Sequence, residues 1–414
     1  KDPIGLLAYN LVDVQISYAM MQECQLYSQQ QALSGIANVG LDNQSPLRIT
    51  ESFIMSYVKD RKILLPTTSH EKRDDKKEGG AFVHDVTIGL HKNVIILDFK
   101  GYYTSMMMSG NMCASTFVTE QDALELVNKK YNSTFTKYED ISAEIIEKEF
   151  IYTPNNAIFR KDKKGVIPEI LVHVREQRNY HKKLMKEETD PQKKNIEDLI
   201  QSGFKRIGNI FYGQFKNPHF RLMNKAIAEA ITSACEHLTK RTNKIIENLD
   251  FYELVKDVPK LSGCIIKVIY NDTDSIFIEF PSSLTGQEMD IIGKVIEKHI
   301  NSLIPSIVKE LFNIDKDTCY IEIEYDDKKA MKAMVQMPSK TNKDVGAKKR
   351  YIYLVYNKDG TVDQMPHFVG VEAVRSDTSP MVLEVQTQLS KLILNEKPYQ
   401  EVRKYLLDSH KGFN

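Results

Sequence analysis

The sequence predicts a mixed α+β fold with more than one domain, and three observations support this. The chain has 414 residues, which at roughly 150 residues per domain corresponds to two to four domains. β-branched runs bounded by turn residues occur beside long stretches with a helical pattern, so both strands and helices are expected. Hydrophobic residues make up 42 % of the chain and charged residues 27 %, a composition that excludes a disordered or collagen-like protein.

The N-terminal part is predicted to be helical and then extended. The pattern is mostly helical from Ile4 to about Met55, and a charged, loop-like stretch runs from Lys59 to Gly80. Strands are expected between Val83 and Phe99, because residues 94–97 (VIIL) form a β-branched run. This run delivers Asp98 to the end of a strand.

Two adjacent helices are predicted in the middle of the chain. Pro168 precedes Glu169, an arrangement typical of a first helical turn, so a helix is expected from there to about Glu188. Asp190-Pro191 breaks it, and a second helix should run from Gln192 to about Tyr212, with Gly213 as its stop. The two helices form a predicted antiparallel hairpin rich in Lys and Arg.

The C-terminal half is predicted to contain a β-hairpin with carboxylates at its tip. Residues 264–270 and 275–280 are β-rich runs separated by residues 271–274 (NDTD). The other expected elements are helices at residues 224–248 and 286–312, strands at 320–325 and 351–356, and helices over the last fifty residues.

Charge is balanced overall but separated locally. Lys+Arg and Asp+Glu number 56 each, so no global basic field draws the chain to a polyanion. Thirteen basic residues stand against eight acidic ones between Arg160 and Arg206, and eight against one between Lys328 and Arg350. A polyanion site must therefore come from local segregation of this kind.

Cysteine usage and apolar stretches limit the class of protein. The five cysteines lie far apart without a CxxC pair, which disfavours a zinc site or a disulfide framework and favours a reducing compartment. Residues 24–41 and 101–119 carry no charge but contain many polar side chains that a bilayer core penalises, so no membrane contact is expected. The chain begins with Lys1 without a signal-peptide pattern, which predicts an internal fragment of a longer protein.

Asp98, Asp272 and Asp274 are the first candidates for chemistry. If their strands pair in one sheet, Asp98 and Asp274 come together, and like charges at short range are tolerated when a divalent cation lies between them. Mg²⁺ held by one or two carboxylates plus substrate phosphates is the usual arrangement for phosphoryl transfer. The alternative is that Asp272 and Asp274 are ordinary turn residues.

Three motifs resemble those of family B DNA polymerases and follow that family's order. Residues 98–105 (DFKGYYTS) resemble its DxxSLYPS motif, residues 205–213 (KRIGNIFYG) its KxxxNSxYG motif, and residues 270–275 (YNDTDS) its YGDTDS motif. Weaker matches are Gly79-Gly80, Gln177-Arg178 with Lys182, residues 348–351 (KKRY) and residues 370–372 (GVE). The spacing and wording look closest to the phage and viral branch, especially the T-even type.

The resemblance implies a right-hand polymerase fragment, with an antiparallel palm sheet, a two-helix fingers hairpin and a partial helical thumb. The implied division is 1–30 as the end of a 3′–5′ exonuclease domain, 31–165 as the N-terminal part of the palm, 166–216 as fingers, 217–367 as the rest of the palm and 368–414 as the start of the thumb.

The implied activity is template-directed DNA synthesis in DNA replication. A DNA-directed DNA polymerase adds deoxynucleotides to a primer 3′-hydroxyl and releases pyrophosphate by two-metal phosphoryl transfer. The implied partners are primer-template DNA and deoxynucleoside triphosphates, with a processivity clamp as a further candidate and no membrane. The implied metals are two Mg²⁺ ions, with Mn²⁺ as an alternative, and the implied location is the cytoplasm of a bacterium or an infected host cell.

Metal-site roles follow from the resemblance. Asp98 and Asp274 would bind the two metals together with the Phe99 carbonyl, and Asp272 would be a supporting carboxylate. Lys205 is a candidate proton donor to pyrophosphate.

The predicted helical hairpin presents cations that could converge on a triphosphate. Arg178 and Lys182 are four residues apart and share a face, while Lys205, Asn209 and Tyr212 share a face of the partner helix. By resemblance, the cations clamp the phosphates, and Asn209 and Tyr212 face the nascent base pair. The alternative is a solvated face on charged helices.

Sugar choice and DNA contacts are also implied by the resemblance. Tyr103 matches the steric gate against a ribose 2′-hydroxyl, and a core tyrosine in a strand is the alternative. The basic cluster that opens a strand at 348–351 would contact the duplex backbone, although such clusters are often simply solvated. The implied DNA-binding residues are Gly79, Gly80, Tyr212, Gly213, Lys348, Lys349, Arg350 and Tyr351.

Four positions depart from the family pattern. Gly101 stands where the family usually has Ser, Thr104 where it has Pro, and Ile210 where it has Ser. Asn271 replaces the hairpin Gly, and we expect it to hold a positive φ there, since Asn does so more readily than most residues.

Tyr9 and Asp13 resemble the YxxxD motif that closes the exonuclease domain of these polymerases. A helix with a stray Tyr and Asp at i, i+4 is the alternative. The other exonuclease carboxylates would precede Lys1, and one carboxylate cannot assemble a two-metal nuclease. We therefore expect this fragment to lack proofreading and its full-length parent to have it.

Two rival functions remain open. Reverse transcriptases and RNA polymerases typically carry adjacent aspartates at the hairpin, whereas Thr273 separates the two here. A polymerase-like module that binds primer-template without chemistry is the second rival, which Gly101 and Thr104 keep open and the intact Asp98, Asp274 and Lys205 disfavour.

Overall fold

The structure is a computed structural model and describes residues 2–59, 61–67, 86–255, 261, 264, 266–326, 330–339, 342–357, 359–375 and 378–411. Gly79 and Gly80 lie outside the described residues, as does the start of the strand region predicted from Val83.

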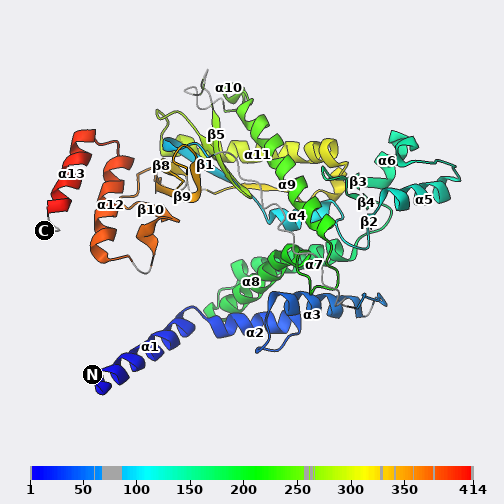
Figure 1. The fold of residues 1–414 in the computed structure, drawn as a ribbon, viewed down its shortest axis with the longest axis horizontal. Coiled ribbons are helices and arrows are strands. Elements are labelled where there is room, and N and C mark those ends of the chain that lie inside the picture. Colours follow the sequence, from blue (N-terminus) through cyan, green and yellow to red (C-terminus); the bar gives the residue numbers. More distant parts are fainter. Residues whose placement is uncertain are drawn as a thin grey trace.

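A twisted antiparallel sheet forms the centre of the molecule (Figure 1). Its order is β10-β9-β8-β1-β6-β5. β8 and β7 share one edge of β1: β8 pairs with residues 89–94, and β7 pairs with residues 97–99. The strands are β1 (Gly89–Phe99), β5 (Lys267–Asp272), β6 (Ser275–Glu279), β7 (Ile323–Tyr325), β8 (Met331–Pro338), β9 (Gly346–Val355) and β10 (His367–Val369). The predicted mixed fold is confirmed, although β8 was not predicted.

Both faces of β1 are covered, which explains its continuous apolar run. Ile95 and Leu97 belong to the main core beneath helices α9 (Lys225–Glu247) and α11 (Gly286–Phe312), while Val94 and Ile96 belong to a second cluster on the other face. All four side chains are at most 3 % exposed. A strand buried on both faces reads as a β-branched run without alternation, so β1 forms a rigid support for Asp98.

The predicted helical hairpin is present as α7 (Val166–Glu187) and α8 (Pro191–Gln214). Asp190 caps α8 by accepting hydrogen bonds from the backbone amides of Gln192 and Lys193, with Pro191 in the first turn. The stop predicted at Gly213 is wrong, because α8 continues through it to Gln214. Helices α2 (Leu26–Ala37) and α3 (Pro46–Lys59) pack against this hairpin on the side away from the sheet (Figure 1).

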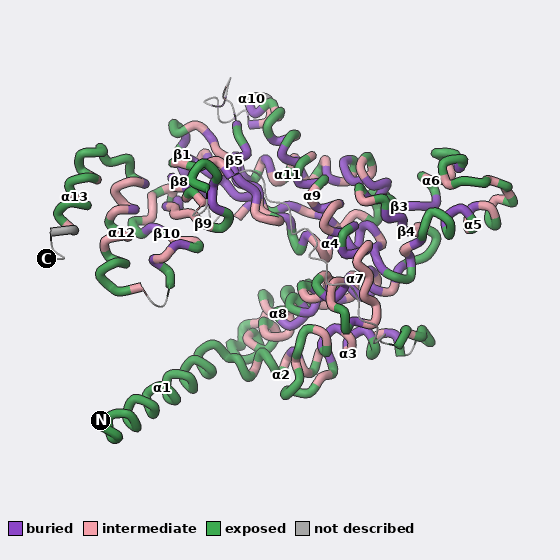
Figure 2. Tube along the Cα trace, in the orientation of Figure 1, coloured by how far each residue is buried: buried purple, intermediate pink, exposed green. Residues whose placement is uncertain are grey.

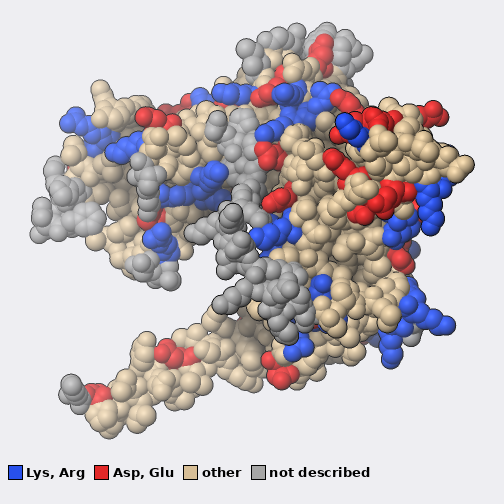
Figure 3. All heavy atoms as spheres, turned by 45° about the vertical axis from the view of Figure 1, so that its right-hand side comes forward, with Lys and Arg blue, Asp and Glu red and all other residues tan. Residues whose placement is uncertain are grey.

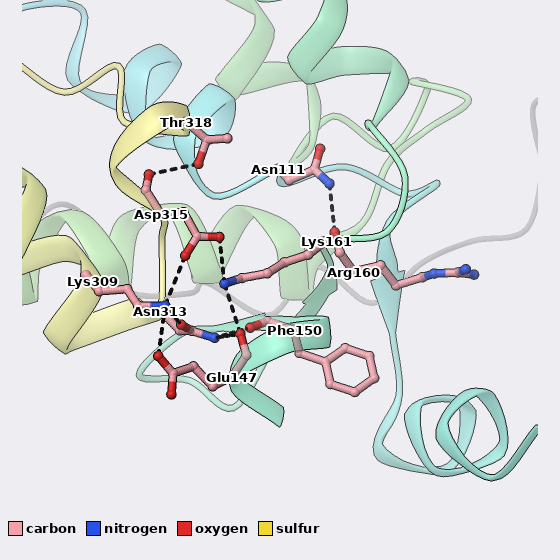
Figure 4. Close-up of polar contacts among 9 residues, drawn as sticks. All are labelled: Asn111, Glu147, Phe150, Arg160, Lys161, Lys309, Asn313, Asp315 and Thr318. Atoms are coloured by element: carbon pink, nitrogen blue, oxygen red, sulfur yellow. Dashed lines mark hydrogen bonds and ion pairs between the residues drawn. The ribbon is translucent and has the colours of Figure 1, made fainter. Parts of the chain in front are cut away.

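A small subdomain projects beside the sheet and has its own core. It contains α5 (Glu120–Tyr131), α6 (Ala143–Glu149) and a sheet of β2 (Phe117–Val118), β4 (Ile158–Arg160) and β3 (Phe150–Tyr152). Figure 4 shows how polar contacts join it to the end of α11. Asn313 donates hydrogen bonds of 2.7 Å to the carbonyls of Glu147 and Phe150, and Lys161 Nζ reaches Asp315 at 2.9 Å.

Helices α12 (Pro380–Leu394) and α13 (Tyr399–Lys411) lie at the β9–β10 edge of the sheet, where Leu394 packs against Ala333 and Leu354. The C-terminal region predicted to be helical also contains β10 and a short 3₁₀ helix at Glu372–Val374. The remaining elements are α4 (Tyr102–Ser109), α10 (Phe251–Leu254) and 3₁₀ turns at Tyr138–Asp140 and Lys316–Thr318.

Helix α1 (Pro3–Glu23) extends away from the body and has no buried residue (Figure 2). Figure 3 shows it as a mostly uncharged arm, whereas Lys/Arg and Asp/Glu gather in separate groups on the body. Within the described part of the chain, it is the single helix long and apolar enough to cross a membrane by length and composition. Helices that pack against protein meet the same criterion, so this property assigns no location.

Candidate nucleotidyl-transfer site

Strand register brings the predicted carboxylates together at one end of the sheet. Asp98 is opposite Ser275 on β6 and opposite Glu324 on β7. Ser275 Oγ donates a hydrogen bond to Asp98 Oδ1, and the Phe99 amide donates to the carbonyl of Asp274 at 2.9 Å. The turn between β5 and β6 therefore lies directly beside the end of β1, as expected if their strands pair.

The carboxylates of Asp98 and Asp272 lie close enough to Asp274 to repel its charge. The Asp274 side chain is exposed, yet partial desolvation by surrounding protein atoms and repulsion from Asp98 raise the pKa of its carboxyl above the usual value. Lys349 offsets part of the charge, because its Nζ lies 3.2 Å from Asp272 Oδ1. Two carboxylates that repel each other across a strand pair form a site that a cation would stabilise.

The donor set fits divalent metal ions completed by substrate. Among the described residues, no group of three or more His, Cys, Asp or Glu side chains could hold a metal without further ligands. Mg²⁺ commonly uses one or two carboxylates plus substrate phosphates and water, and Asp98 with Asp274 supplies such a pair. The Phe99 ring stacks on Tyr102 with centroids 4.1 Å apart, while the metal role of its carbonyl stays a prediction.

The conformation of the hairpin tip differs from the expectation. The residue with positive φ is Thr273 (φ +62), so the expectation that Asn271 holds this conformation is wrong. Asn271 is instead the penultimate residue of β5 and is 1 % exposed. Its amide forms hydrogen bonds with Asn243 on α9, so a buried partner explains this departure from glycine.

The departure at Gly101 also has a backbone cause. Gly101 has φ +52 and precedes the first residue of α4. An L side chain is strained in this left-handed region, so glycine relieves strain in a tight strand-to-helix turn. Thr104, on the same helix, donates from Oγ1 to the carbonyl of Gly208 at 3.1 Å, which links α4 to α8.

Tyr103 lies in helix α4 and not in a strand, and its partly buried side chain packs against the main core. Its ring faces that of Tyr212 from α8, with centroids 4.3 Å apart and an angle of 30°. Burial raises the pKa of both phenols, that of Tyr212 to about 12, so both remain neutral at physiological pH. Tyr102 is the core residue of the pair: it is 3 % exposed and donates to the Cys235 carbonyl at 2.6 Å.

The cations of the α7–α8 hairpin meet at one cavity of about 480 Å³. Its lining includes Arg178, Lys182, Lys205 and Asn209, together with Gly101 and Thr104 from the β1–α4 turn. Arg178 is half-buried, its Nε has no hydrogen-bond partner, and burial lowers the pKa of its guanidinium. Within the described chain, Lys182 and Lys205 form no ion pair, so both ammonium groups are available to bind an anion in this cavity.

Two carboxylates in this cavity were missed by sequence reasoning. Glu322 and Glu324 line its β7 side, and Glu322 pairs with Arg175 at 3.2 Å and with Lys100 at 3.8 Å. Glu324 lies opposite Asp98 in the β1–β7 register. The cavity is therefore adjacent to the cluster formed by Asp98, Asp272 and Asp274. Their alternation in residues 321–325 (IEIEY) was the signal that could have placed both side chains on the exposed face of a strand.

The basic cluster on β9 divides into free and engaged cations. Lys348 is exposed, and Lys349 contacts Asp272. Arg350 is committed within the protein, because its guanidinium binds both Glu372 oxygens at 2.8 and 2.9 Å and its Nε donates to the Gly370 carbonyl. Tyr351 packs against Phe277 with centroids 5.6 Å apart. Contacts of this cluster with DNA stay predictions, and Arg350 would have to leave Glu372 to make one.

The remaining predicted residues lie apart from the cavity. Tyr9 and Asp13 are exposed on α1, and Gly213 is exposed within α8. A larger cavity, about 820 Å³, lies beside α2 and α3 and contains none of the predicted residues. Its Glu51 and Arg221 are ion-paired with each other at 3.2 Å.

Comparison with known proteins gives the family. A sequence model described as DNA polymerase family B matches residues 38–346, well over half of the chain. The chain therefore belongs to DNA polymerase family B.

Curated relatives come from eukaryotes, archaea and bacteria. The chain is 23 % identical over 411 residues to the DNA polymerase zeta catalytic subunit of Schizosaccharomyces pombe, covering 96 % of this chain and 25 % of that protein. It is 23 % identical over 402 residues to a Thermococcus gorgonarius DNA polymerase (95 % and 42 %) and 25 % identical over 329 residues to Escherichia coli DNA polymerase II (80 % and 35 %). The chain thus spans less than half the length of these relatives.

A solved structure shares the fold. The family B DNA polymerase of Pyrobaculum calidifontis matches with a TM-score of 0.61 at 23 % identity, covering 100 % of this chain and 44 % of that one.

Proposed function

We propose that the chain is the catalytic core of a DNA-directed DNA polymerase that adds deoxynucleotides to a primer 3′-hydroxyl during DNA replication. The observation that carries this proposal is that the Asp98–Asp274 carboxylates lie directly beside a cavity lined by cations of the helical hairpin. Glu324, which is opposite Asp98 in the β1–β7 register, lines the same cavity as these cations. Phosphoryl transfer needs alignment of the attacking and leaving oxygens plus neutralisation of charge, and these two groups match the two needs.

Each residue is assigned a role by its place. Asp98 and Asp274 would hold two divalent ions, Mg²⁺ or Mn²⁺, with the Phe99 carbonyl as a further ligand and Asp272 in support. Bound ions would supply Lewis-acid activation of the 3′-hydroxyl and neutralisation of the phosphates. Lys205 would orient the triphosphate and give a proton to departing pyrophosphate. The remaining phosphate and base contacts would come from Arg178, Lys182, Asn209 and Tyr212.

Tyr103 is proposed as the group that selects the sugar. Its ring lies at the start of α4, near enough to Asp274 to feel its charge, and is held against Tyr212 of α8. A ring fixed in this way would occupy the volume that a ribose 2′-hydroxyl needs.

The finer assignments remain proposals as well. We infer palm, fingers and thumb regions at 31–165 with 217–367, at 166–216 and at 368–414, and an exonuclease remnant at 1–30 that carries Tyr9 and Asp13. Primer-template DNA would contact Gly79, Gly80, Gly213, Lys348, Lys349, Arg350 and Tyr351. We further propose a viral source in the T-even-like branch, a processivity clamp as partner and a cytoplasmic location. These proposals follow from the resemblance of the motifs to the phage and viral branch.

Primer extension with each nucleotide class tests the proposed function. The purified chain, a primed template and Mg²⁺ should extend the primer with deoxynucleotides and far less with ribonucleotides. Extension with ribonucleotides alone would favour an RNA polymerase. Tight binding of the primed template without extension by either class would favour a binding module without chemistry.

A further inference from the structure

Asn243 and Asn271 form a buried amide pair beside the carboxylates. Asn243 Nδ2 donates to Asn271 Oδ1 at 2.7 Å, and Asn271 Nδ2 donates to Asn243 Oδ1 and to the Ser275 carbonyl, both at 3.3 Å. The two side chains are 5 % and 1 % exposed. Each amide carries both a donor and an acceptor, so the pair satisfies groups that would otherwise be buried without partners.

The pair joins α9 to the turn that carries Asp272 and Asp274. Asn271 directly precedes Asp272, and Ser275, whose carbonyl it holds, directly follows Asp274. The amide therefore spans the base of the tip and contacts α9 in the same network. Among the described residues, no other residue of the tip forms a hydrogen bond with α9.

The same face of α9 also holds the Asp98 side of the site. Tyr102 OH contacts the Cys235 carbonyl at 2.6 Å and Thr239 Oγ1 at 2.9 Å. Cys235, Thr239 and Asn243 are spaced four residues apart and so lie along one stripe of the helix. One rigid stripe thus fixes both the β1–α4 turn and the β5–β6 turn.

We propose that Asn243 and Asn271 are positioning residues that set the distance of the hairpin carboxylates from Asp98. The motif that residues 270–275 resemble has glycine at position 271 and offers no side chain there, so this device belongs to the present chain. The inference rests on the proposed polymerase function for its catalytic consequence, but the structural part is measurable on the protein alone.

Hydrogen–deuterium exchange of the peptide over residues 267–280 gives the structural readout. Asn243→Ala leaves the Asn271 amide buried and unsatisfied, so the hairpin should open about tenfold more often than in the wild type. Asn248→Ala is the matched control, because Asn248 is an exposed asparagine at the end of the same helix. Asn271→Gly removes both the link to α9 and the bond to the Ser275 carbonyl, and it should open the hairpin at least as often as Asn243→Ala does.

The Mg²⁺ dependence of single-turnover nucleotide addition gives the catalytic readout. In Asn243→Ala the Mg²⁺ concentration for half-maximal rate should rise about tenfold, with primer-template affinity unchanged, because misplaced carboxylates weaken metal binding and not DNA binding. Exchange equal to that of Asn248→Ala would overturn the proposal. Faster exchange with an unchanged Mg²⁺ dependence would overturn the positioning role. If the wild type adds no nucleotide, the polymerase function fails, while the exchange data still decide whether the pair fixes the hairpin.

Discussion

The sheet and the α7–α8 hairpin hold their functional side chains in opposite ways. Asp98 sits in a strand buried on both faces and is fixed by ladder register and by Ser275. Lys182 and Lys205 extend from helix faces into a cavity and pair with no carboxylate in the described chain. The carboxylates proposed to hold metal ions are fixed by the backbone, whereas the cations proposed to bind a triphosphate keep their side-chain freedom.

Removing a strand-borne carboxylate should have the largest effect. Asp98→Asn or Asp274→Asn should lower nucleotide addition by about a thousandfold or more, roughly 4 kcal/mol of transition-state stabilisation, because each removes one anion of the proposed two-metal site. The asparagine keeps the size of the side chain. Single-turnover incorporation and primer-template binding should be measured together, and substantial extension by either variant would refute the metal assignment.

Removing a helix-borne cation should have an intermediate effect. Lys205→Ala and Arg178→Ala should each lower incorporation at limiting nucleotide by about ten- to a hundredfold, since a hydrogen bond to a charged group contributes about 1.5–3 kcal/mol. Duplex binding should change little. Lys183→Ala is the control, because Lys183 lies on α7 but pairs with Glu187 on the solvent side. Incorporation curves like those of the control would contradict the triphosphate role and support the alternative that both residues lie on a solvated helix face.

Truncating Tyr103 should change the selection between ribonucleotides and deoxyribonucleotides more than the rate of nucleotide addition. Tyr103→Ala should raise ribonucleotide use relative to deoxyribonucleotide use by about tenfold or more, because the ring is proposed to fill the space that a ribose 2′-hydroxyl needs. Tyr102→Phe, which loses hydrogen bonds to α9 in the core, should lower stability without changing sugar choice. Equal discrimination by Tyr103→Ala and the wild type would assign sugar selection to another group.

The smallest expected effect concerns the pH dependence of the free energy of unfolding, to which a His–Glu pair between β1 and β6 contributes. His91 Nδ1 on β1 lies 3.1 Å from Glu279 Oε2 on β6, and its Nε2 lies 2.9 Å from the Thr87 carbonyl, so the protonated ring donates to both. Burial alone would lower the His91 pKa, but these hydrogen bonds outweigh it and raise the pKa above 6.5. Burial would raise the Glu279 pKa, but the bonds from His91 and the Lys92 amide lower it below 4.5.

The sign of the pH dependence follows from both shifts. The His91 contribution is complete below pH 6.5 and is lost as pH rises through its folded-state pKa, while the Glu279 contribution is present above pH 4.5 and is lost as pH falls. His91→Gln should therefore cost about 1 kcal/mol of unfolding free energy between these values and less at pH 8. Denaturant unfolding across this range measures it, and a cost that is constant with pH would contradict the charged pair.

Elements with a local signal could be predicted from the sequence. The Asp190-Pro191 break and the periodic pattern gave α7 and α8 within a few residues, and the β-branched run gave β1. Asp98 and the NDTD turn follow apolar runs, so their place at strand ends was also predictable. Boundaries depended on tertiary context: Gly213 does not stop α8, because a helical glycine is tolerated where no other conformation is required.

Features that depend on partners distant in the chain were not predictable. The hydrogen bonds of Asn271 go to Asn243, and Arg350 is held by Glu372. β8 was not predicted because residues 331–338 (MKAMVQMP) contain a single β-branched side chain, and pairing with β1 and β9 makes them a strand. Glu324 became part of the site only when the β1–β7 register was known. A single sequence carries the residue types but not the contacts that assign their roles.

Templated addition of one nucleotide tests the central claim most directly. Four primed templates that differ in the first unpaired base are each offered the four deoxynucleoside triphosphates separately with Mg²⁺, and primer-template binding is followed by fluorescence anisotropy in the same samples. The account predicts addition of the complementary nucleotide on each template by the wild type, and binding without addition by Asp274→Asn. Binding by the wild type with no addition, or addition that ignores the template base, would contradict it.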